Sequence, residues 1–166
     1  PERTLSESRR GLAVLASVEV PTDQATTFAA FTDPDVYSRW LGVPVTIRDG
    51  RFAATMEWGT EVRGTYDVVC PPELIAMRWD FDPENVPVPG GGLVGYLRVR
   101  PSPAGGSVVE VHQLAESAAQ AEFMEVAWTL VLGRLKTGVL AASDPSATVP
   151  PRPRRPRRRD GGGAVA

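Results

Sequence analysis

The feature that most constrains this chain is a change in hydrophobic period close to residue 115. Across residues 43–114 apolar side chains recur at every second position, whereas across residues 117–142 they recur at every third or fourth. The first period is typical of β-strands with one buried face, and the second is typical of an amphipathic α-helix. The helix stripe is wide, so it needs a large apolar partner, which only the buried face of the strands can supply. We therefore predict an α+β fold in which an antiparallel sheet packs on a long C-terminal helix.

The alternating segment divides into runs whose inward side chains can be assigned from their parity. Val108 and Val109 are both apolar, so a slip of one residue in the last run would turn His112 inward. Our preferred register places His112 on the outer face. The expected inward rows are Phe52, Ala54, Met56 and Trp58; Val62, Gly64, Tyr66 and Val68; Ile75, Met77, Trp79 and Phe81; Leu93, Gly95, Leu97 and Val99; and Val109, Val111 and Gln113.

Two short helices are expected before the sheet segment and the long helix after it, each with a recognisable cap. A first strand over residues 12–20 should end at Pro21, and a short helix capped by Thr22 or Asp23 should bury Ala25, Phe28, Ala29 and Phe31. Asp33 then precedes Pro34 as cap and first helical residue of a second short helix, which carries Trp40 and ends before Gly42. The long helix should begin at Ser117-Ala118-Ala119-Gln120, which has the capping-box pattern.

Charge and composition divide the 166 residues into one domain and two flanking segments. The formal net charge is −2, but residues 144–166 carry six Arg and two Asp, so residues 1–143 have a net charge of −6. We predict a flexible segment over residues 1–11, a domain over 12–142 and a disordered Pro/Arg-rich tail over 143–166. The acidic domain argues against nucleic acid as its main ligand, although the Arg-rich tail suits weak contact with acidic surfaces or nucleic acid.

The cysteine content and the hydropathy indicate a cytoplasmic protein without a membrane span. The chain has one cysteine, Cys70, which excludes an internal disulfide and any multi-cysteine zinc site. No apolar stretch approaches the roughly 20 residues that cross a bilayer. The pattern does not specify an oligomeric state.

Several turn and core motifs resemble those of one known superfamily. The segments are Phe31-Thr32-Asp33-Pro34 with Trp40, Asp49-Gly50-Arg51-Phe52, Gly64-Thr65-Tyr66, Pro71-Pro72-Glu73-Leu74 with Trp79, and Trp128 with Leu132 and Leu135. Over residues 12–140 the chain resembles the START-like SRPBCC superfamily, and within it the bacterial homologues of the activator of heat-shock-protein ATPase. The resemblance implies a helix-grip (Bet v 1-like) fold: a curved antiparallel β-sheet, two short helices, and a cavity between sheet and long C-terminal helix. Such cavities serve lipids, polyketides, other apolar molecules or protein contacts.

The expected inward face is rich in aromatic side chains and poor in polar groups, which is typical of small-molecule sites. Gly64 and Gly95 on that face are expected to leave space for a ligand. We therefore predict that the domain binds a small hydrophobic molecule, such as a lipid, a polyketide or an aromatic metabolite. The predicted ligand-binding residues are Trp40, Met56, Trp58, Tyr66, Met77, Trp79, Phe81, Leu97, Gln113, Met124 and Trp128.

The sequence contains no recognisable catalytic constellation, metal site or cofactor motif. His112 is the only histidine, and Cys70 beside two prolines is expected to be a small buried apolar residue. The carboxylates Glu57, Glu61, Asp80 and Glu110 all fall on outward positions. The match of residues 90–95 to G-x-G-x-x-G precedes a strand where a dinucleotide fold needs a helix, so these glycines are expected in a flap over the pocket mouth.

Two other functions stay open beside ligand binding. A polyketide cyclase-like enzyme could act by shaping a reactive chain, with Tyr66 and Gln113 as polar guides. A co-chaperone-like protein-interaction module is the third, since the resemblance includes an activator of a chaperone ATPase. Turnover that disappears in Tyr66→Phe would favour the enzyme.

Overall fold

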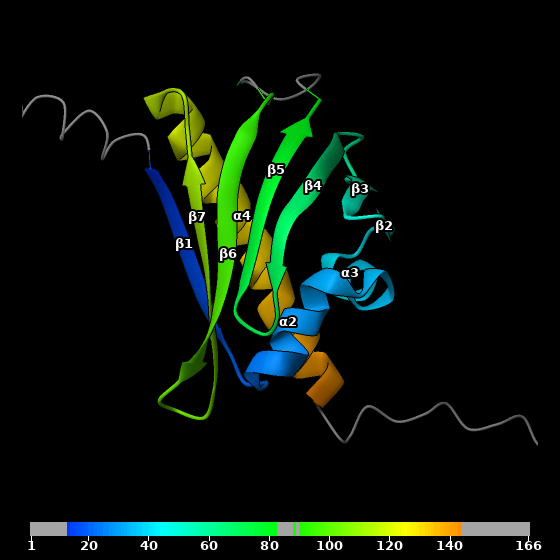
Figure 1. Cartoon of the computed structure of the whole chain (residues 1–166), viewed down its shortest axis with the longest axis vertical. Coiled ribbons are helices and arrows are strands. Elements are labelled where there is room, and N and C mark those ends of the chain that lie inside the picture. Colours follow the sequence, from blue (N-terminus) through cyan, green and yellow to red (C-terminus); the bar gives the residue numbers. More distant parts are fainter. Residues whose placement is uncertain (1–12, 83–87, 89, 144–166) are drawn as a thin grey trace, which may run out of the picture.

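The computed structural model describes residues 13–82, 88 and 90–143. The predicted flexible segment, nearly all of the predicted tail, and residues 83–87 and 89, which precede the glycines of the predicted flap, lie outside these residues. The described part is an α+β fold with one sheet and three helices (Figure 1). The predicted fold class is confirmed.

The sheet contains seven antiparallel strands in the order β1-β7-β6-β5-β4-β3-β2. The register is regular except for one shift in the pairing of β4 with β5, and consecutive strands from β2 to β7 are also neighbours in space, which is the predicted meander. Strand β2 had not been singled out from the sequence; it joins β3 through Asp49 and Gly50, both at positive φ. The strands are β1 (Ala13–Val20), β2 (Val45–Arg48), β3 (Arg51–Thr55), β4 (Glu61–Cys70), β5 (Leu74–Phe81), β6 (Leu93–Ser102) and β7 (Gly106–Leu114).

Two short helices, α2 (Gln24–Thr32) and α3 (Pro34–Leu41), link β1 to β2. The Asp23 side chain caps α2, and Asp33 caps α3 by accepting hydrogen bonds from the backbone N–H groups of Asp35 and Val36, with Pro34 at the first helical position. These caps confirm the sequence prediction. The expected buried face of α2 was partly wrong, because Ala25 and Ala29 are exposed. The helix instead buries Thr27, Phe28, Ala30 and Phe31.

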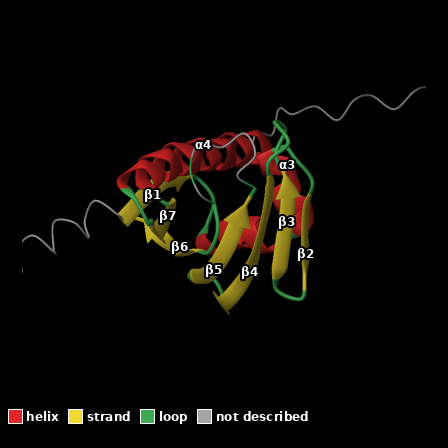
Figure 2. Ribbon diagram, turned by 90° about the horizontal axis from the view of Figure 1, so that it is seen from above, coloured by secondary structure: helices red, strands yellow, loops and turns green. Residues whose placement is uncertain are grey.

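Helix α4 (Ala118–Ser143) lies across the concave face of the sheet (Figure 2). Its first backbone N–H groups are capped by Ser117 Oγ, which accepts from Gln120 N at 3.1 Å. The backbone of α4 is close to β1 on one side and to α3 on the other. Leu132 and Leu135 are at most 1% exposed and anchor the helix in the core. The helix has no comparable backbone contact with β4 or β5, so a gap bounded by side chains opens over that half of the sheet.

The alternation along the strands predicted most inward positions correctly. Ile75, Leu97, Val99 and Val109 are fully buried, and His112 lies on the outer face as expected. Val68 is an exception: a β-bulge between Tyr66 and Val68 shifts the register, so Val68 is exposed instead of inward. One inserted residue exchanges the faces of the positions that follow it.

Cys70, at the end of β4, corrects a second expectation. It was expected to be a small buried residue, but it is exposed. The strand positions around it explain the difference: after the bulge, Val68, Val69 and Cys70 are all exposed where β4 runs out beyond the core.

Candidate functional site

A cavity of about 150 Å³ lies between the sheet and helix α4. Its wall comes from α2, α3, strands β2 to β6 and the middle of α4, whereas β1 and β7 contribute none of the lining side chains. This location follows from the packing of α4, which is tight against β1 and leaves the opposite half of the sheet uncovered. The lining residues are Phe31, Tyr37, Leu41, Val45, Phe52, Ala54, Met56, Trp58, Thr60, Val62, Tyr66, Ile75, Met77, Trp79, Phe81, Leu97, Phe123, Met124, Ala127, Trp128, Leu130 and Val131.

The structure brings together nine of the eleven side chains that the sequence predicted for the site. Each of the nine was expected to face inward: Met124 and Trp128 from the apolar stripe of the long helix, and the other seven from the two-residue period. Two others, Trp40 and Gln113, do not line the cavity. The nine are Met56, Trp58, Tyr66, Met77, Trp79, Phe81, Leu97, Met124 and Trp128.

Trp40 belongs to the core beneath the cavity wall. Its indole N–H donates to the carbonyl of Ala30 at 2.8 Å, and its ring stacks on Tyr37 with centroids 4.7 Å apart. It therefore joins α3 to α2 and presents Tyr37, in place of itself, to the cavity. Trp40 was expected at the site as an aromatic residue of a short helix, and it is not among the side chains that line the cavity.

Gln113 lies behind Trp128, separated from the cavity by the indole ring. Its Oε1 accepts a hydrogen bond from Trp128 Nε1 at 2.7 Å, and its side chain is 3% exposed. Its Nε2 has no hydrogen-bond partner among the described residues. Gln113 thus faces inward as expected, but it orients Trp128 and is not itself among the lining side chains.

The inward glycines do not create the ligand space that was expected of them. A Cβ on Gly64 would lie 2.2 Å from the ring of Phe52, so the Phe52 side chain already occupies that volume. A Cβ on Gly95 would lie 2.6 Å from the carbonyl oxygen of His112, which shows that the neighbouring backbone fills the position. These glycines permit close packing, and the cavity arises from the placement of α4.

The polar groups on the cavity wall are few and lie at two ends. The Tyr66 hydroxyl donates to the carbonyl of Phe31 at 2.7 Å, which links β4 to α2. Tyr37 is close enough to Tyr66 for the two to interact electrostatically, and burial raises the pKa of both phenols, so both are neutral donors at physiological pH. At the other end, Thr60 Oγ1 is buried and has no hydrogen-bond partner within the described part of the chain.

The mouth of the cavity is framed by Trp58 and Leu130. Both line the cavity and are about half exposed, at 49% and 51%. Next to them Arg134 on α4 forms an ion pair with Glu57 and donates to the carbonyl of Leu41 at 2.9 Å. The hydrogen bond from Arg134 lowers the pKa of Glu57, so the pair stays charged. It fixes the turn after β3 and the end of α3 against α4.

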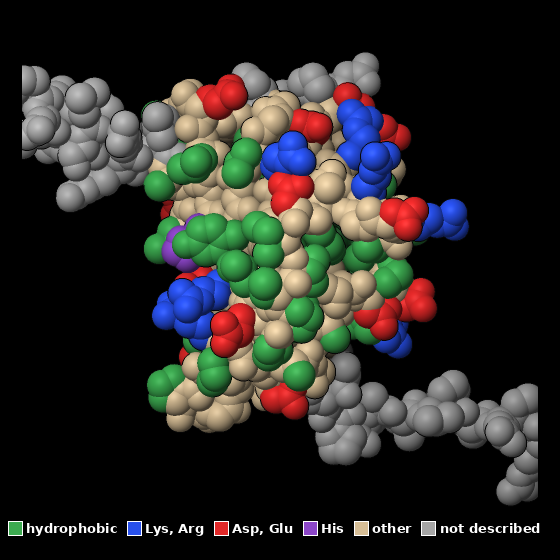
Figure 3. All heavy atoms as spheres, in the orientation of Figure 1, with side chains coloured by type: hydrophobic (Ala, Val, Ile, Leu, Met, Phe, Trp, Pro, Cys, Tyr) green, Lys and Arg blue, Asp and Glu red, His purple; other side chains and the backbone are tan. Residues whose placement is uncertain are grey.

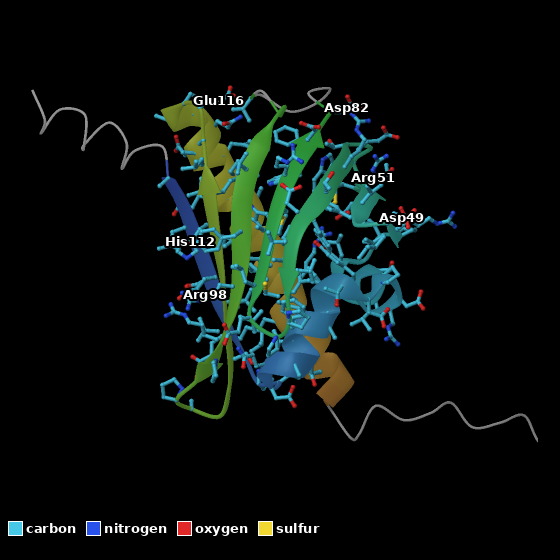
Figure 4. All side chains as sticks on the ribbon, viewed as in Figure 1. Asp49, Arg51, Asp82, Arg98, His112 and Glu116 are labelled. Carbon is cyan, nitrogen blue, oxygen red and sulfur yellow. The ribbon has the colours of Figure 1, made fainter. Side chains whose placement is uncertain are left out.

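Among the described residues, no Asp, Glu, Lys, Arg or His side chain lines the cavity. Figure 4 shows Asp49, Arg51, Asp82 and Glu116 at the periphery of the fold. His112 contacts Glu110 on the outer sheet face at 3.3 Å, and the described residues hold no cluster of three metal-ligating side chains. Hydrogen bonds from Arg100 and His112 lower the pKa of Glu110, with Arg100 the larger cause. The four carboxylates predicted to point outward do so.

The outer face of the sheet carries a second apolar surface. The strand register aligns Leu15, His112, Tyr96, Ala76 and Val68 in one row across five strands. Tyr96 stacks on His112 with centroids 4.6 Å apart. Figure 3 shows hydrophobic side chains gathered over this face beside the histidine. From the sequence, His112 was expected on the outer face and Val68 on the inner one, and an apolar outer surface was not predicted.

Several lining residues were missed from the sequence, and one of them carried a readable signal. Phe31, Tyr37 and Leu41 lie on α2 and α3, whose position over the sheet depends on tertiary packing. Thr60 is different, because it continues the even-numbered parity of Met56, Trp58 and Val62. Treating residues 57–61 as a turn hid that continuation, although Met56 N still donates to Thr60 O at 2.9 Å as in a narrow ladder.

Solved structures of the same shape support the fold. MLL2253 from Mesorhizobium loti is 18% identical, with a TM-score of 0.65 over 80% of this chain and 98% of that chain. CalU16 from Micromonospora echinospora is 19% identical, with a TM-score of 0.60 over 76% and 75%. DynU16, a putative protein in the dynemicin biosynthetic locus, is 18% identical, with a TM-score of 0.66 over 78% of this chain and 48% of that one. At these identities the likeness establishes the fold.

Sequence comparison assigns the family. The search of curated proteins found no significant match. Within the described residues, every helix is too short or too polar to span a membrane. The family model for activator of Hsp90 ATPase homolog 1-like proteins matches residues 21–139, which include both short helices, strands β2 to β7 and most of α4. This chain therefore belongs to the family of activator of Hsp90 ATPase homolog 1-like proteins, within the START-like SRPBCC fold that its motifs had indicated.

Proposed function

We propose that this chain binds a small, mostly apolar molecule in the cavity between the sheet and helix α4. The observation that carries the proposal is the cavity wall itself, which consists of aromatic and aliphatic side chains with three hydroxyl groups and no Asp, Glu, Lys, Arg or His. Concave sites with sparse polar groups are how proteins bind such molecules. DynU16, which shares the fold, is described as a protein of a biosynthetic locus, so biosynthetic intermediates are reasonable members of a ligand panel.

The first test is thermal stabilisation of the full chain against lipids, aromatic polyketides and steroid-like compounds. A ligand that binds only the folded state stabilises it by RT ln(1 + [L]/Kd), so the midpoint rises with the logarithm of the ligand concentration once that exceeds Kd. Trp58, Trp79 and Trp128 line the cavity, so the same ligand should change the intrinsic tryptophan fluorescence. A stabilising compound that leaves the fluorescence unchanged would place its site elsewhere.

Two neighbouring alanines on β3 provide a matched pair for this test. Ala54 lines the cavity, whereas Ala53 is exposed on the opposite face of the same strand. Ala54→Leu adds three carbon atoms to the cavity space and is expected to weaken ligand binding by about fivefold to a hundredfold, because overpacking of this kind costs about 1–3 kcal/mol. Ala53→Leu should leave the affinity unchanged. Equal affinities in both variants would contradict the proposed site.

A second candidate function is regulation of a heat-shock chaperone ATPase. The apolar row on the outer sheet face favours it, because exposed apolar patches mark protein contact sites, and the family name points to the partner. If this function holds, the full chain should stimulate an Hsp90-type ATPase, and Tyr96→Lys should abolish the stimulation without affecting the cavity. If no compound of the ligand panel binds and Tyr96→Lys abolishes the stimulation, chaperone regulation replaces ligand binding as the proposed function.

Catalysis by shaping has less support from the geometry. The sequence had named Tyr66 and Gln113 as polar guides for a substrate. The Tyr66 hydroxyl donates a hydrogen bond to the backbone carbonyl of Phe31, and Gln113 Oε1 accepts a hydrogen bond from Trp128 Nε1. Both groups serve the protein's own structure, so Tyr66→Phe primarily removes a link between β4 and α2.

A further inference from the structure

Thr60 is the one polar side chain on the cavity wall that is buried and unpaired within the described residues. It is 4% exposed, and its Oγ1 has no hydrogen-bond partner there. A buried hydroxyl without a partner is unfavourable by about 1–3 kcal/mol. The chain could have avoided this with valine, which has nearly the same shape. The hydroxyl therefore calls for a partner that enters from outside the protein.

Its position separates Thr60 from the other polar groups of the cavity. Thr60 lies just before β4, and Tyr66 lies six residues further along, a separation of roughly 20 Å along an extended strand. Tyr37 sits beside Tyr66 at that far end. Thr60 instead shares the turn after β3 with Trp58, at the mouth. A buried water typically needs about three hydrogen bonds, whereas a ligand already retained by the apolar wall needs only this one polar contact.

The size and charge of the cavity restrict the body of the ligand. A volume of about 150 Å³ is comparable with that of an engineered apolar cavity that takes up benzene. The lining contains no charged side chain, so a carboxylate or ammonium group inside would lose its hydration without compensation. The nearest charges, Glu57 and Arg134, neutralise each other beside the mouth.

We propose that the cavity takes an uncharged compound with a single ring buried inside and a hydroxyl or carbonyl group hydrogen-bonded to Thr60 Oγ1. Any larger part of the ligand extends through the mouth between Trp58 and Leu130. This inference rests on the proposed function and adds the chemical class of the ligand and its orientation, with the polar end toward the mouth.

The test uses three ring probes of nearly equal shape: 4-fluorophenol, fluorobenzene and 4-fluorobenzoate. Their affinities for the full chain can be measured by ¹⁹F NMR titration. We expect 4-fluorophenol to bind about fivefold to tenfold more tightly than fluorobenzene, the ratio given by one hydrogen bond to an otherwise unpaired group. We expect no binding of 4-fluorobenzoate. Equal affinities of phenol and benzene probes, or tight binding of the benzoate, would overturn the assignment.

Variants at Thr60 identify the hydroxyl that makes the contact. Thr60→Val should remove the preference for 4-fluorophenol over fluorobenzene, whereas Thr60→Ser should keep it. Thr55→Val, on the exposed face of β3, is the matched control and should change neither affinity. Loss of the preference in Tyr37→Phe instead of Thr60→Val would move the polar contact to the far end and overturn the proposal.

The outcome also separates this inference from the proposed function. If no ring probe binds but the broader panel yields a ligand that Ala54→Leu excludes, the single-ring assignment fails and the proposed function stands. If neither the probes nor the panel bind, both fail.

Since Thr60→Val removes an unpaired buried hydroxyl, it should not lower the thermal midpoint of the free protein, and a fall of several degrees would show that Thr60 serves the fold instead.

Discussion

Trp128→Ala is expected to lower the free energy of unfolding by about 3–5 kcal/mol, the range for removing a buried tryptophan side chain. The indole packs edge-on against Trp79, with centroids 5.7 Å apart, and is 9% exposed. Its loss would also leave Gln113 Oε1 without the hydrogen bond from Trp128 Nε1. Urea denaturation of the full chain measures the change.

Because natural domains are stable by only about 5–15 kcal/mol, a second variant keeps this prediction testable if Trp128→Ala fails to fold. Trp128→Phe retains an aromatic ring but removes the N–H donor to Gln113 Oε1; because Gln113 Nε2 already has no partner among the described residues, neither polar atom of the buried amide is then hydrogen-bonded. The loss attributable to that amide is about 1–3 kcal/mol. Adding Gln113→Leu removes the unpaired amide and should recover most of this lost free energy of unfolding.

The double-mutant cycle distinguishes this explanation from simple loss of packing. If Trp128→Phe and Gln113→Leu are each destabilising and their combination is less so than their sum by about 1 kcal/mol or more, the pair acts as a unit. Strictly additive losses would mean that the hydrogen bond contributes nothing beyond the volume of the indole. As a control for volume alone, Leu132→Ala on the same helix has no polar partner to leave unpaired.

Most of the fold could be predicted because its determinants are local. The alternation in β5 and β6 fixes which side chains face inward, and the caps at Asp33 and Ser117 fix where two helices begin. A change of period from two to 3.6 then leaves α4 only one surface to cover. These properties depend on near neighbours in the sequence.

The candidate site was predictable only where the strand parity is unbroken. The bulge after Tyr66 turns Val68 outward, and no sequence signal marks it. The wall contributed by α2 and α3 depends on how these helices pack, which decides that Tyr37, and not Trp40, faces the cavity. The cavity itself results from the placement of helix α4. The space beside the two glycines that were expected to provide room is occupied by Phe52 and by neighbouring backbone.

The placement of α4 gives the second large prediction, in which two glycines of one helix have opposite effects. Gly133→Ala adds a Cβ that meets nothing within 4 Å, so it should stabilise the protein by up to about 1 kcal/mol through helix propensity. Gly138→Ala gains the same propensity, but its Cβ would lie 2.7 Å from Trp40 Cβ and 3.1 Å from Trp40 Cα. The overpacking should destabilise by about 1–3 kcal/mol.

The sign of the Gly138→Ala effect depends on whether Trp40 can yield. The clash is with the Cα and Cβ of Trp40, and its ring is held by the carbonyl of Ala30 and by the stack on Tyr37. Helix α4 must therefore move away from α3, which shifts Tyr37 and Leu41 on the cavity wall relative to α4. We expect a lower urea midpoint than in Gly133→Ala and a changed affinity for any cavity ligand. Equal stabilisation by both alanines, with ligand binding unaltered, would show that the contact between α3 and α4 does not set the shape of the cavity.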